Sequence, residues 1–182
     1  VLLAAAETRV TKICLASSIN AIGGAWSRSA RYDYLPVDEA HPSYNEDAYS
    51  LSKWVGEAQA DSIARRHGGL TISSLRLHGL NKRAERTDAS LAGIPPEFHL
   101  WGYVDIDSAA RAVALSLQAP FSGHEAFFIV APRTVFSADI ASCDLAARHY
   151  PGVPLCGALD QNAGFYDCAK AERLLGWRHE DL

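Results

Sequence analysis

The chain has 182 residues, of which 48% are hydrophobic and 21% charged, and its formal net charge at pH 7 is -4. This is the balance of one soluble globular domain that is long enough to bury a core. The mild acidity gives no electrostatic argument for a nucleic-acid or anionic-membrane partner, and no apolar run reaches the ~20 residues that a spanning helix needs.

The chain opens with VLLAAAETRV, without an initiator methionine. Its apolar run is short, no basic segment precedes it, and charged Glu7 and Arg9 follow at once, which is unlike a signal peptide. Residues 1–8 are rich in alanine and favour a helix. We therefore expect a fragment that begins near the end of a helix.

The next segments predict a strand, a loop, a long helix and a second strand. KICLAS (Lys12–Ser17) is a short apolar run that enters the Ser/Asn/Gly-rich turn SSINAIGG, and residues 24–44 read as loop. A helix is expected from Asn45 or Asp47, with Asn45 as a plausible N-cap and acidic residues in the first turn, up to the His67-Gly68-Gly69 stop. Its apolar stripe is expected at Trp54, Val55, Ala58, Ile63 and Ala64. LTISSLRL (residues 70–77) is the second strand.

The second half continues the alternation. A polar stretch over residues 81–88 and the Pro95-Pro96 pair lead to a helix that starts at Asp105 or Ser108 and ends before Pro120. EAFFIVA (125–131) predicts a strand, residues 137–149 a helix, PGVPLCG a turn with a short strand, and residues 167–177 a helix capped by Gly176. Alternating strands and helices favour an α/β fold with a parallel sheet.

Cysteine and histidine spacing excludes two kinds of site. The four cysteines are scattered without a CxxC pair, which predicts reduced thiols in a cytoplasmic protein. The seven histidines form no HxxxH or His/Cys cluster, so we predict no metal site.

Tyr49 and Lys53 are the first candidates for chemistry. Residues at positions i and i+4 share one helix face, and an ammonium beside a phenol favours the phenolate, so the tyrosine could exchange protons near neutral pH. A YxxxK pair also occurs by chance as ordinary helix surface. Ser18 adds weight because it follows the first strand, at the edge where an α/β sheet binds ligands, although a turn serine can equally bond local backbone.

The ordered set LASSINAIGG, YSLSK, TISSLRLHG and YVDIDSAARA resembles successive motifs of the extended short-chain dehydrogenases/reductases, the NAD-dependent epimerase/dehydratase family. The resemblance covers nearly the whole chain. It implies a partial Rossmann-like fold, a doubly wound parallel sheet with flanking helices, plus a small C-terminal substrate-binding portion. Residues 1–80 would be the C-terminal part of the NAD(P)-binding domain. Residues 81–182 would hold the remaining strand, helices and the substrate-binding portion, interleaved with the first part.

The resemblance also implies roles for individual residues. Tyr49 would be the general acid/base, Lys53 would assist it and bind the nicotinamide ribose, and Ser18 would orient the substrate hydroxyl or carbonyl. The family pattern, a serine five residues before a glycine, falls on Ser18 and Gly23 rather than on neighbouring Ser17. Tyr103 is either a substrate contact or a core or rim aromatic. The implied cofactor-binding set is Ser17, Tyr49, Lys53, Leu77, His78 and Gly79, and the implied substrate contacts are Ser18, Asn20 and Tyr103.

Three positions depart from the family pattern. No GxxGxxG phosphate loop occurs in the chain, so the resemblance implies that roughly a hundred preceding residues are missing, about one mononucleotide-binding half of the fold. Ile22 stands where an aromatic residue commonly precedes the glycine, which puts substrate contacts there in doubt. Ser108 stands where the later helix usually begins with aspartate.

The reaction class expected from these features is an NAD(P)-dependent oxidation or reduction of a sugar-like hydroxyl or carbonyl, with NAD favoured over NADP. The stretch from Arg76 to Tyr103 is short and resembles compact uronate or aldose dehydrogenases. Lys82, Arg83 and Arg86 either meet phosphates or form a solvated charge run. A nucleotide-sugar epimerase and a catalytically silent truncated module are the alternatives. A homodimer through the Tyr49–Lys53 helix, with Trp54 in the interface, is the expected assembly.

Overall fold

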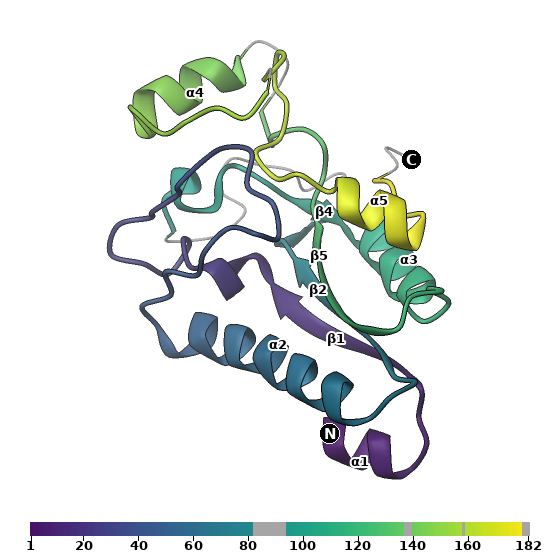
Figure 1. Cartoon of the computed structure of the whole chain (residues 1–182). Helices are drawn as coiled ribbons and strands as arrows, with labels where there is room; N and C mark the ends of the chain where they lie inside the picture. The colour runs from purple at the N-terminus through teal and green to yellow at the C-terminus, as the bar shows by residue number, and fades with distance from the viewer. Residues whose placement is uncertain (82–93, 137–139, 158, 180–182) are drawn as a thin grey trace.

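A three-stranded parallel sheet forms the centre of the computed structural model, which describes residues 1–81, 94–136, 140–157 and 159–179. Its strands are β1 (Lys12–Ser18), β2 (Thr71–Leu77) and β5 (Gly123–Ile129), in the order β1-β2-β5 (Figure 1). Ser18 pairs with Leu77, and Leu77 pairs with Ile129, so the three carboxyl ends lie level. The predicted parallel α/β sheet is confirmed, although β5 starts and ends two residues earlier than expected.

Helices cover both faces of this sheet. Helices α1 (Leu2–Glu7) and α2 (Ala48–Arg66) pack on one face, and α3 (Ile106–Ser116) and α5 (Ala169–Leu175) lie on the other (Figure 1). Alternating residues of β2 supply the two cores, because successive strand side chains point to opposite faces. Ile72 belongs to the cluster beneath α2, whereas Leu75 belongs to the cluster beneath α3 and α5. This layering is the partial Rossmann-like arrangement expected from the sequence.

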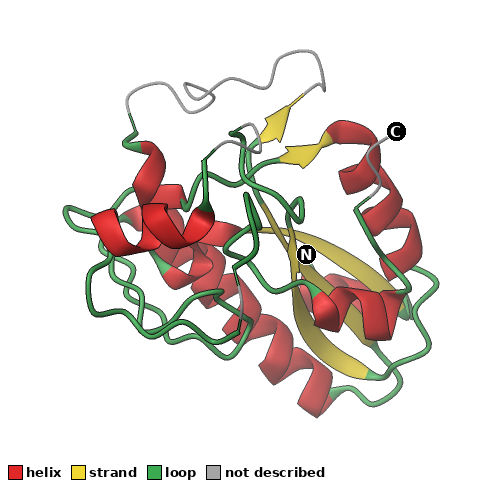
Figure 2. Cartoon of the chain, turned by 90° about the horizontal axis from the view of Figure 1, so that it is seen from above, coloured by secondary structure: helices red, strands yellow, loops and turns green. Residues whose placement is uncertain are grey.

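A third apolar core lies beyond the carboxyl ends of the strands (Figure 1). It gathers the loop of residues 24–44, the turn η3 (Pro96–His99) and helix α4 (Ser142–His149) around buried Trp101. Two isolated bridges, Leu35 with Leu155 and Val37 with Tyr166, tie the loop to the C-terminal segments. A small separate pair, β3 (Leu80–Asn81) and β4 (Val104–Asp105), completes the strands (Figure 2). The expected strand in PGVPLCG is reduced to the single bridge at Leu155.

The start of α2 agrees with the second of its two expected positions, Asp47, but not with the expected cap. Asp47 is the N-cap, and its Oδ1 accepts a hydrogen bond from the Ser50 backbone N–H at 2.9 Å. Asn45 lies before the helix, where its Nδ2 donates to Ser43 Oγ at 2.6 Å. The predicted Asn45 cap was therefore wrong, and no acidic residue lies within the first turn.

The buried face of α2 also differs. Trp54 and Val55 are exposed by 45% and 38%, whereas the fully buried positions are Ser50, Glu57 and Ala60. The expected apolar stripe was wrong at Trp54, Val55 and Ala58, which are exposed, because this part of the helix packs over polar groups of the strands, but Ala64 packs against the cluster beneath α2. Ile63 does pack against the cluster beneath α2, as expected.

Two other helix ends were partly readable from sequence. Asp105 is the residue before α3, so the alternative start at Ser108, which lies inside the helix, was wrong. Gly176 ends α5 with a left-handed φ of 68°, as predicted.

The four cysteines are free thiols. Among the described residues, no helix combines the length and apolarity that crossing a membrane requires.

The Asp47 cap gives a prediction for stability. Asp47→Ala should lower the free energy of unfolding by about 1 kcal/mol, because the Ser50 N–H then loses its acceptor. Asp47→Asn keeps a capping oxygen and should change stability by only a few tenths of that amount. Urea denaturation of the three proteins measures the difference, and equal losses for the alanine and asparagine variants would contradict the capping role.

Candidate active site

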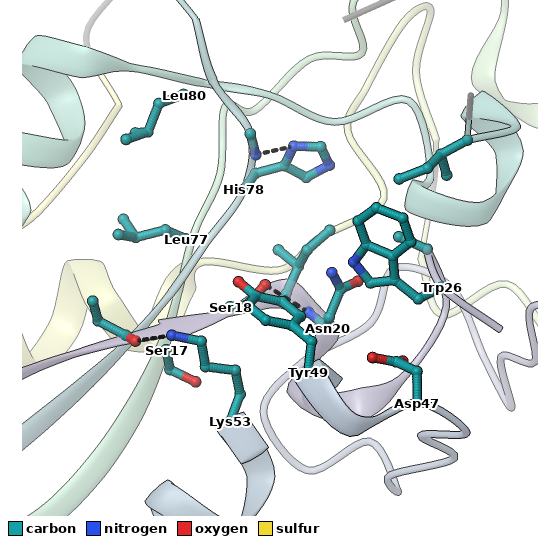
Figure 3. A pocket seen from close by; sticks show the side chains of 15 residues that line it. Ser17, Ser18, Asn20, Trp26, Asp47, Tyr49, Lys53, Leu77, His78 and Leu80 are labelled. Carbon is teal, nitrogen blue, oxygen red and sulfur yellow. Dashed lines mark hydrogen bonds between the residues drawn. The ribbon is translucent and has the colours of Figure 1, made fainter. Parts of the chain in front are cut away.

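The carboxyl ends of β1 and β2 and the first turns of α2 surround a pocket of about 750 Å³ (Figure 3). Every residue of the implied cofactor-binding and substrate-contact sets lines this pocket except Tyr103. The chain converges here because β1 and β2 end level, at Ser18 and Leu77, and α2 begins nearby. This is the edge of an open α/β sheet where ligands generally bind.

Tyr49 and Lys53 project from α2 into the pocket (Figure 3). The Lys53 ammonium lies 5.4 Å from the centroid of the Tyr49 ring. Its Nζ donates a hydrogen bond to the Ala16 carbonyl oxygen of β1 at 2.7 Å. Tyr49 is 47% exposed, so its ring is open to the pocket rather than packed in the core. The lysine is thus fixed to the sheet, while the tyrosine remains accessible.

Ser18 and Asn20 form the floor of the pocket beside Tyr49 (Figure 3). Ser18 Oγ accepts a hydrogen bond from the Asn20 backbone N–H at 3.2 Å and caps the short turn η1 (Ile19–Ile22). This local bond uses an oxygen lone pair, so the hydroxyl hydrogen can still be donated. Asn20 is buried and its Oδ1 has no hydrogen-bond partner among the described residues. A buried acceptor without a donor fits a ligand hydroxyl or amide.

Ser17 makes a contact that sequence reasoning missed. Its Oγ donates to Glu57 Oε1 at 2.6 Å, and the same carboxylate binds the Arg76 guanidinium, with Arg76 Nη2 2.8 Å from Glu57 Oε2. The Glu57 and Arg76 side chains are 9% and 7% exposed, so this is a buried ion pair. Glu57 gave no signal in the sequence, because a glutamate within a helix usually lies on a solvated face.

His78 lines the pocket wall next to β2, and His99, which is not a lining residue, packs edge-on against its ring. The Gly79 N–H donates to His78 Nδ1 at 2.6 Å, which leaves His78 Nε2 to donate to the His99 carbonyl oxygen at 3.1 Å. Burial, reinforced by the neighbouring His99, lowers the pKa of His78 to about 3. Burial likewise lowers the pKa of His99 to about 4. Both rings are therefore uncharged at neutral pH, and the wall contributes no positive charge.

Trp26 and Asp47 are among the pocket residues that the sequence analysis did not assign to the site. Trp26 lines the pocket from the loop after η1 and is 53% exposed, and Asp47 lines it beside the start of α2 (Figure 3). The only signal for Trp26 was an aromatic residue just after the Gly23-Gly24 turn. Exposed aromatic rings stack on flat or apolar ligand faces.

Tyr103 is a correction to the predicted substrate contacts. Its side chain is 3% exposed, and its ring packs edge-on to His179 at 5.8 Å between centroids. It is not among the residues that line the pocket, because it points into the interior near the C-terminal segment. Tyr103 is therefore a core aromatic, which was the other role that the sequence allowed.

The basic residues that the sequence offered as phosphate contacts cannot be placed relative to the pocket. Lys82, Arg83 and Arg86 lie outside the described residues. Within the described part of the chain, no group of three or more His, Cys, Asp or Glu side chains could hold a metal ion.

The buried histidines predict a pH dependence of stability. Their pKa values of about 3 and about 4 lie below the ordinary value of 6.5 in the unfolded chain, so the unfolded state binds more protons in acid. The free energy of unfolding should fall as pH drops below 6.5, with a slope of up to about 1.4 kcal/mol per pH unit for each ring. Urea denaturation at pH 7.5, 6 and 5 measures this slope. His99→Gln should flatten it, and an unchanged slope would contradict the assignment.

No family model matches the sequence, and no curated protein matches it. Solved structures do match. A short-chain dehydrogenase/reductase superfamily protein from Agrobacterium tumefaciens with bound NAD gives a TM-score of 0.65 at 18% identity, over 99% of this chain and 66% of that one.

Two further structures extend the comparison. UDP-glucose 4-epimerase of Thermotoga maritima with UDP-glucose gives a TM-score of 0.61 at 18% identity, over 98% of this chain and 62% of that one. A glucuronic acid dehydrogenase from Chromohalobacter salexigens gives a TM-score of 0.61 at 17% identity, over 99% of this chain and 50% of that one. The chain thus spans between half and two-thirds of the length of these proteins. Over that length, it has the fold of the short-chain dehydrogenase/reductase proteins and of the NAD-dependent nucleotide-sugar epimerases.

Proposed function

We propose that the chain is the part of an NAD(P)-dependent oxidoreductase that carries the proton-transfer groups and the substrate pocket. The observation that supports this proposal is the meeting of Tyr49, Lys53 and Ser18, from two separate elements, around one pocket. The substrate class is a sugar-like alcohol or carbonyl. The solved structures of the same fold include a glucuronic acid dehydrogenase and epimerases of UDP-sugars, which supports this class.

The residues present fit the nicotinamide end of such a cofactor. Apolar Ile19, Leu77 and Leu80 line the pocket and suit a flat ring. Lys53 uses one donor on the Ala16 carbonyl, and an ammonium has three, so two remain for ribose hydroxyls. Neighbours of the same fold are crystallised with NAD, so we favour NAD over NADP.

In the proposed reaction, the residues of this chain handle the proton. A bound nicotinamide supplies the hydride acceptor or donor. For oxidation, the Tyr49 phenolate would take the proton of the substrate hydroxyl, while the carbon that bears this hydroxyl loses hydride and becomes a carbonyl. The Lys53 ammonium lies 5.4 Å from the centroid of the Tyr49 ring, beside the position of the transferred proton. Ser18 donates its hydroxyl hydrogen to the substrate oxygen and holds it toward Tyr49.

An epimerase is the second candidate, supported by the UDP-sugar epimerases among the structures of this fold. It would begin with the same oxidation and then return hydride to the opposite face of the carbonyl. The two reactions are distinguished by product: a dehydrogenase accumulates NADH, whereas an epimerase inverts the sugar without net NADH. A catalytically silent module remains the third possibility, because the sequence holds no GxxGxxG.

The function is tested by binding and turnover. NAD⁺ and NADH titrations should be made on this chain and on the chain with any upstream coding sequence of its gene restored. Binding by the extended form alone would fit a catalytic portion that lacks its own phosphate loop. Failure of both forms to bind would favour the silent module. The four free cysteines suit the reducing cytoplasm, where we propose that the protein acts.

Tyr49→Phe should then lower kcat about 10²- to 10⁴-fold, because the acid/base is removed, while NADH affinity changes little. Tyr34→Phe is the control, since Tyr34 bonds Asp38 in the loop and does not line the pocket. Steady-state kinetics and fluorescence titration measure the two effects. A Tyr49→Phe protein with kcat near that of the unmodified enzyme would contradict the proposed acid/base.

We also propose that two copies associate through α2. Leu51, Trp54 and Val55 lie three and four residues apart and are exposed by 47%, 45% and 38%, which makes one apolar helix face. Trp54→Glu should shift a dimer toward monomer in light scattering, because it places a charge in the contact. Val113→Glu, at an exposed apolar position of α3, is the matched control. A monomeric unmodified chain would contradict the dimer.

A further inference from the structure

We propose that Glu57 is a positioning residue for the active site, an inference that rests on the function proposed above. Its carboxylate fixes the end of β1 against α2, so that Lys53 and Ser18 keep their places around the pocket. Nothing in the YxxxK pattern points to this residue, and it does not line the pocket.

Two successive hydrogen bonds, from Lys53 and to Glu57, connect α2 to β1. Tyr49, Lys53 and Glu57 lie at intervals of four on one face of α2. Lys53 Nζ binds the Ala16 carbonyl oxygen at 2.7 Å, and one turn later Glu57 Oε1 accepts from Ser17 Oγ at 2.6 Å. Two consecutive residues of β1, directly before Ser18, are thus bonded to two consecutive turns of the helix.

Arg76 fixes the orientation of the Glu57 carboxylate in the second of these hydrogen bonds. Its Nε donates to both carboxylate oxygens of Glu57, at 3.1 and 3.3 Å, and its Nη2 donates to Oε2 at 2.8 Å. Both oxygens are therefore occupied, and Oε1 is held where the Ser17 hydroxyl must donate to it. A glutamine would offer only one acceptor oxygen, and its amide hydrogens would face the guanidinium donors. The site needs a carboxylate.

The charge balance follows from the same contacts. Glu57 neutralises Arg76 within the buried layer between α2 and β2. Of the described residues that line the pocket, Lys53 is then the only cation and the one that faces Tyr49. Loss of Glu57 would leave the Arg76 charge buried and unpaired, and would release Ser17 from the helix.

A purely structural role for Glu57 is the competing explanation, and a matched pair of serines separates the two. Ser17→Ala removes the tie to β1 and leaves the Glu57–Arg76 ion pair intact. Ser142→Ala removes an equally short bond, from a fully buried Ser142 Oγ to the Ala163 carbonyl at 2.6 Å, in α4 away from the pocket (Figure 1). Both variants should lose similar stability.

In turnover, Glu57→Gln and Ser17→Ala should lower kcat about 10- to 100-fold with a smaller change in substrate KM, because misplaced reacting groups slow the chemical step. Ser142→Ala should leave kcat unchanged, and Ser17→Thr, which keeps the hydroxyl, should retain most of it. If Ser17→Ala raises only the KM for NAD⁺, or if Ser142→Ala slows turnover equally, the positioning role is wrong.

A second readout does not depend on activity. The chain has four lysines, so reductive methylation with ¹³C-formaldehyde gives few NMR signals, and Lys53→Arg assigns one of them. The Lys53 signal should move in Glu57→Gln and Ser17→Ala but stay in place in Ser142→Ala. An unmoved signal in both site variants would overturn the inference. If the unmodified enzyme shows no turnover, the proposed function fails, and this signal alone decides whether Glu57 positions Lys53.

Discussion

The buried ion pair between Glu57 and Arg76 is the constraint on which the arrangement of the site depends. Removing two charges from water costs several kcal/mol each, and the cost is offset only when geometry and hydrogen bonds are good. Here both carboxylate oxygens are occupied and the guanidinium also lies over the Phe128 ring, 5.2 Å from its centroid. Removing one partner of such a pair typically costs about 3–5 kcal/mol. The pair fixes α2 to β2, and Ser17 extends the connection to β1.

A neighbouring carboxylate extends this polar layer to the third strand. Glu39 Oε1, from the loop between β1 and α2, accepts from the Phe128 backbone N–H of β5 at 2.7 Å. Burial raises the pKa of Glu39, since its charge is only partly compensated by Arg76 and Lys170. The face between α2 and the sheet is thus held by specific polar contacts as much as by apolar packing. Polar contacts have defined directions, which suits a helix that must present reactive side chains at a fixed angle.

The pocket is lined by one cation, Lys53, by one acidic residue, Asp47, and by the uncharged ring of His78. Lys53 is bound to β1, whereas His78 and His99 are neutral because burial disfavours their charged forms. The solved structures that share this fold include a glucuronic acid dehydrogenase and UDP-sugar epimerases, so the fold by itself does not decide the reaction.

Local sequence was sufficient for the elements and for part of the site. The β-branched run of β2, the glycine after α5 and the four-residue spacing of Tyr49 and Lys53 are all encoded by near neighbours. Ser18 was placed at a sheet edge for the same reason. In contrast, Trp54 faces outward, Tyr103 is buried, and Glu57 lies beneath the helix. These features depend on partners that are distant in the chain: Glu57 meets Arg76 19 residues later and Ser17 40 residues earlier. Backbone propensities and periodicity are set by adjacent residues, whereas the partner of a polar side chain is decided only when strand pairing brings remote segments together.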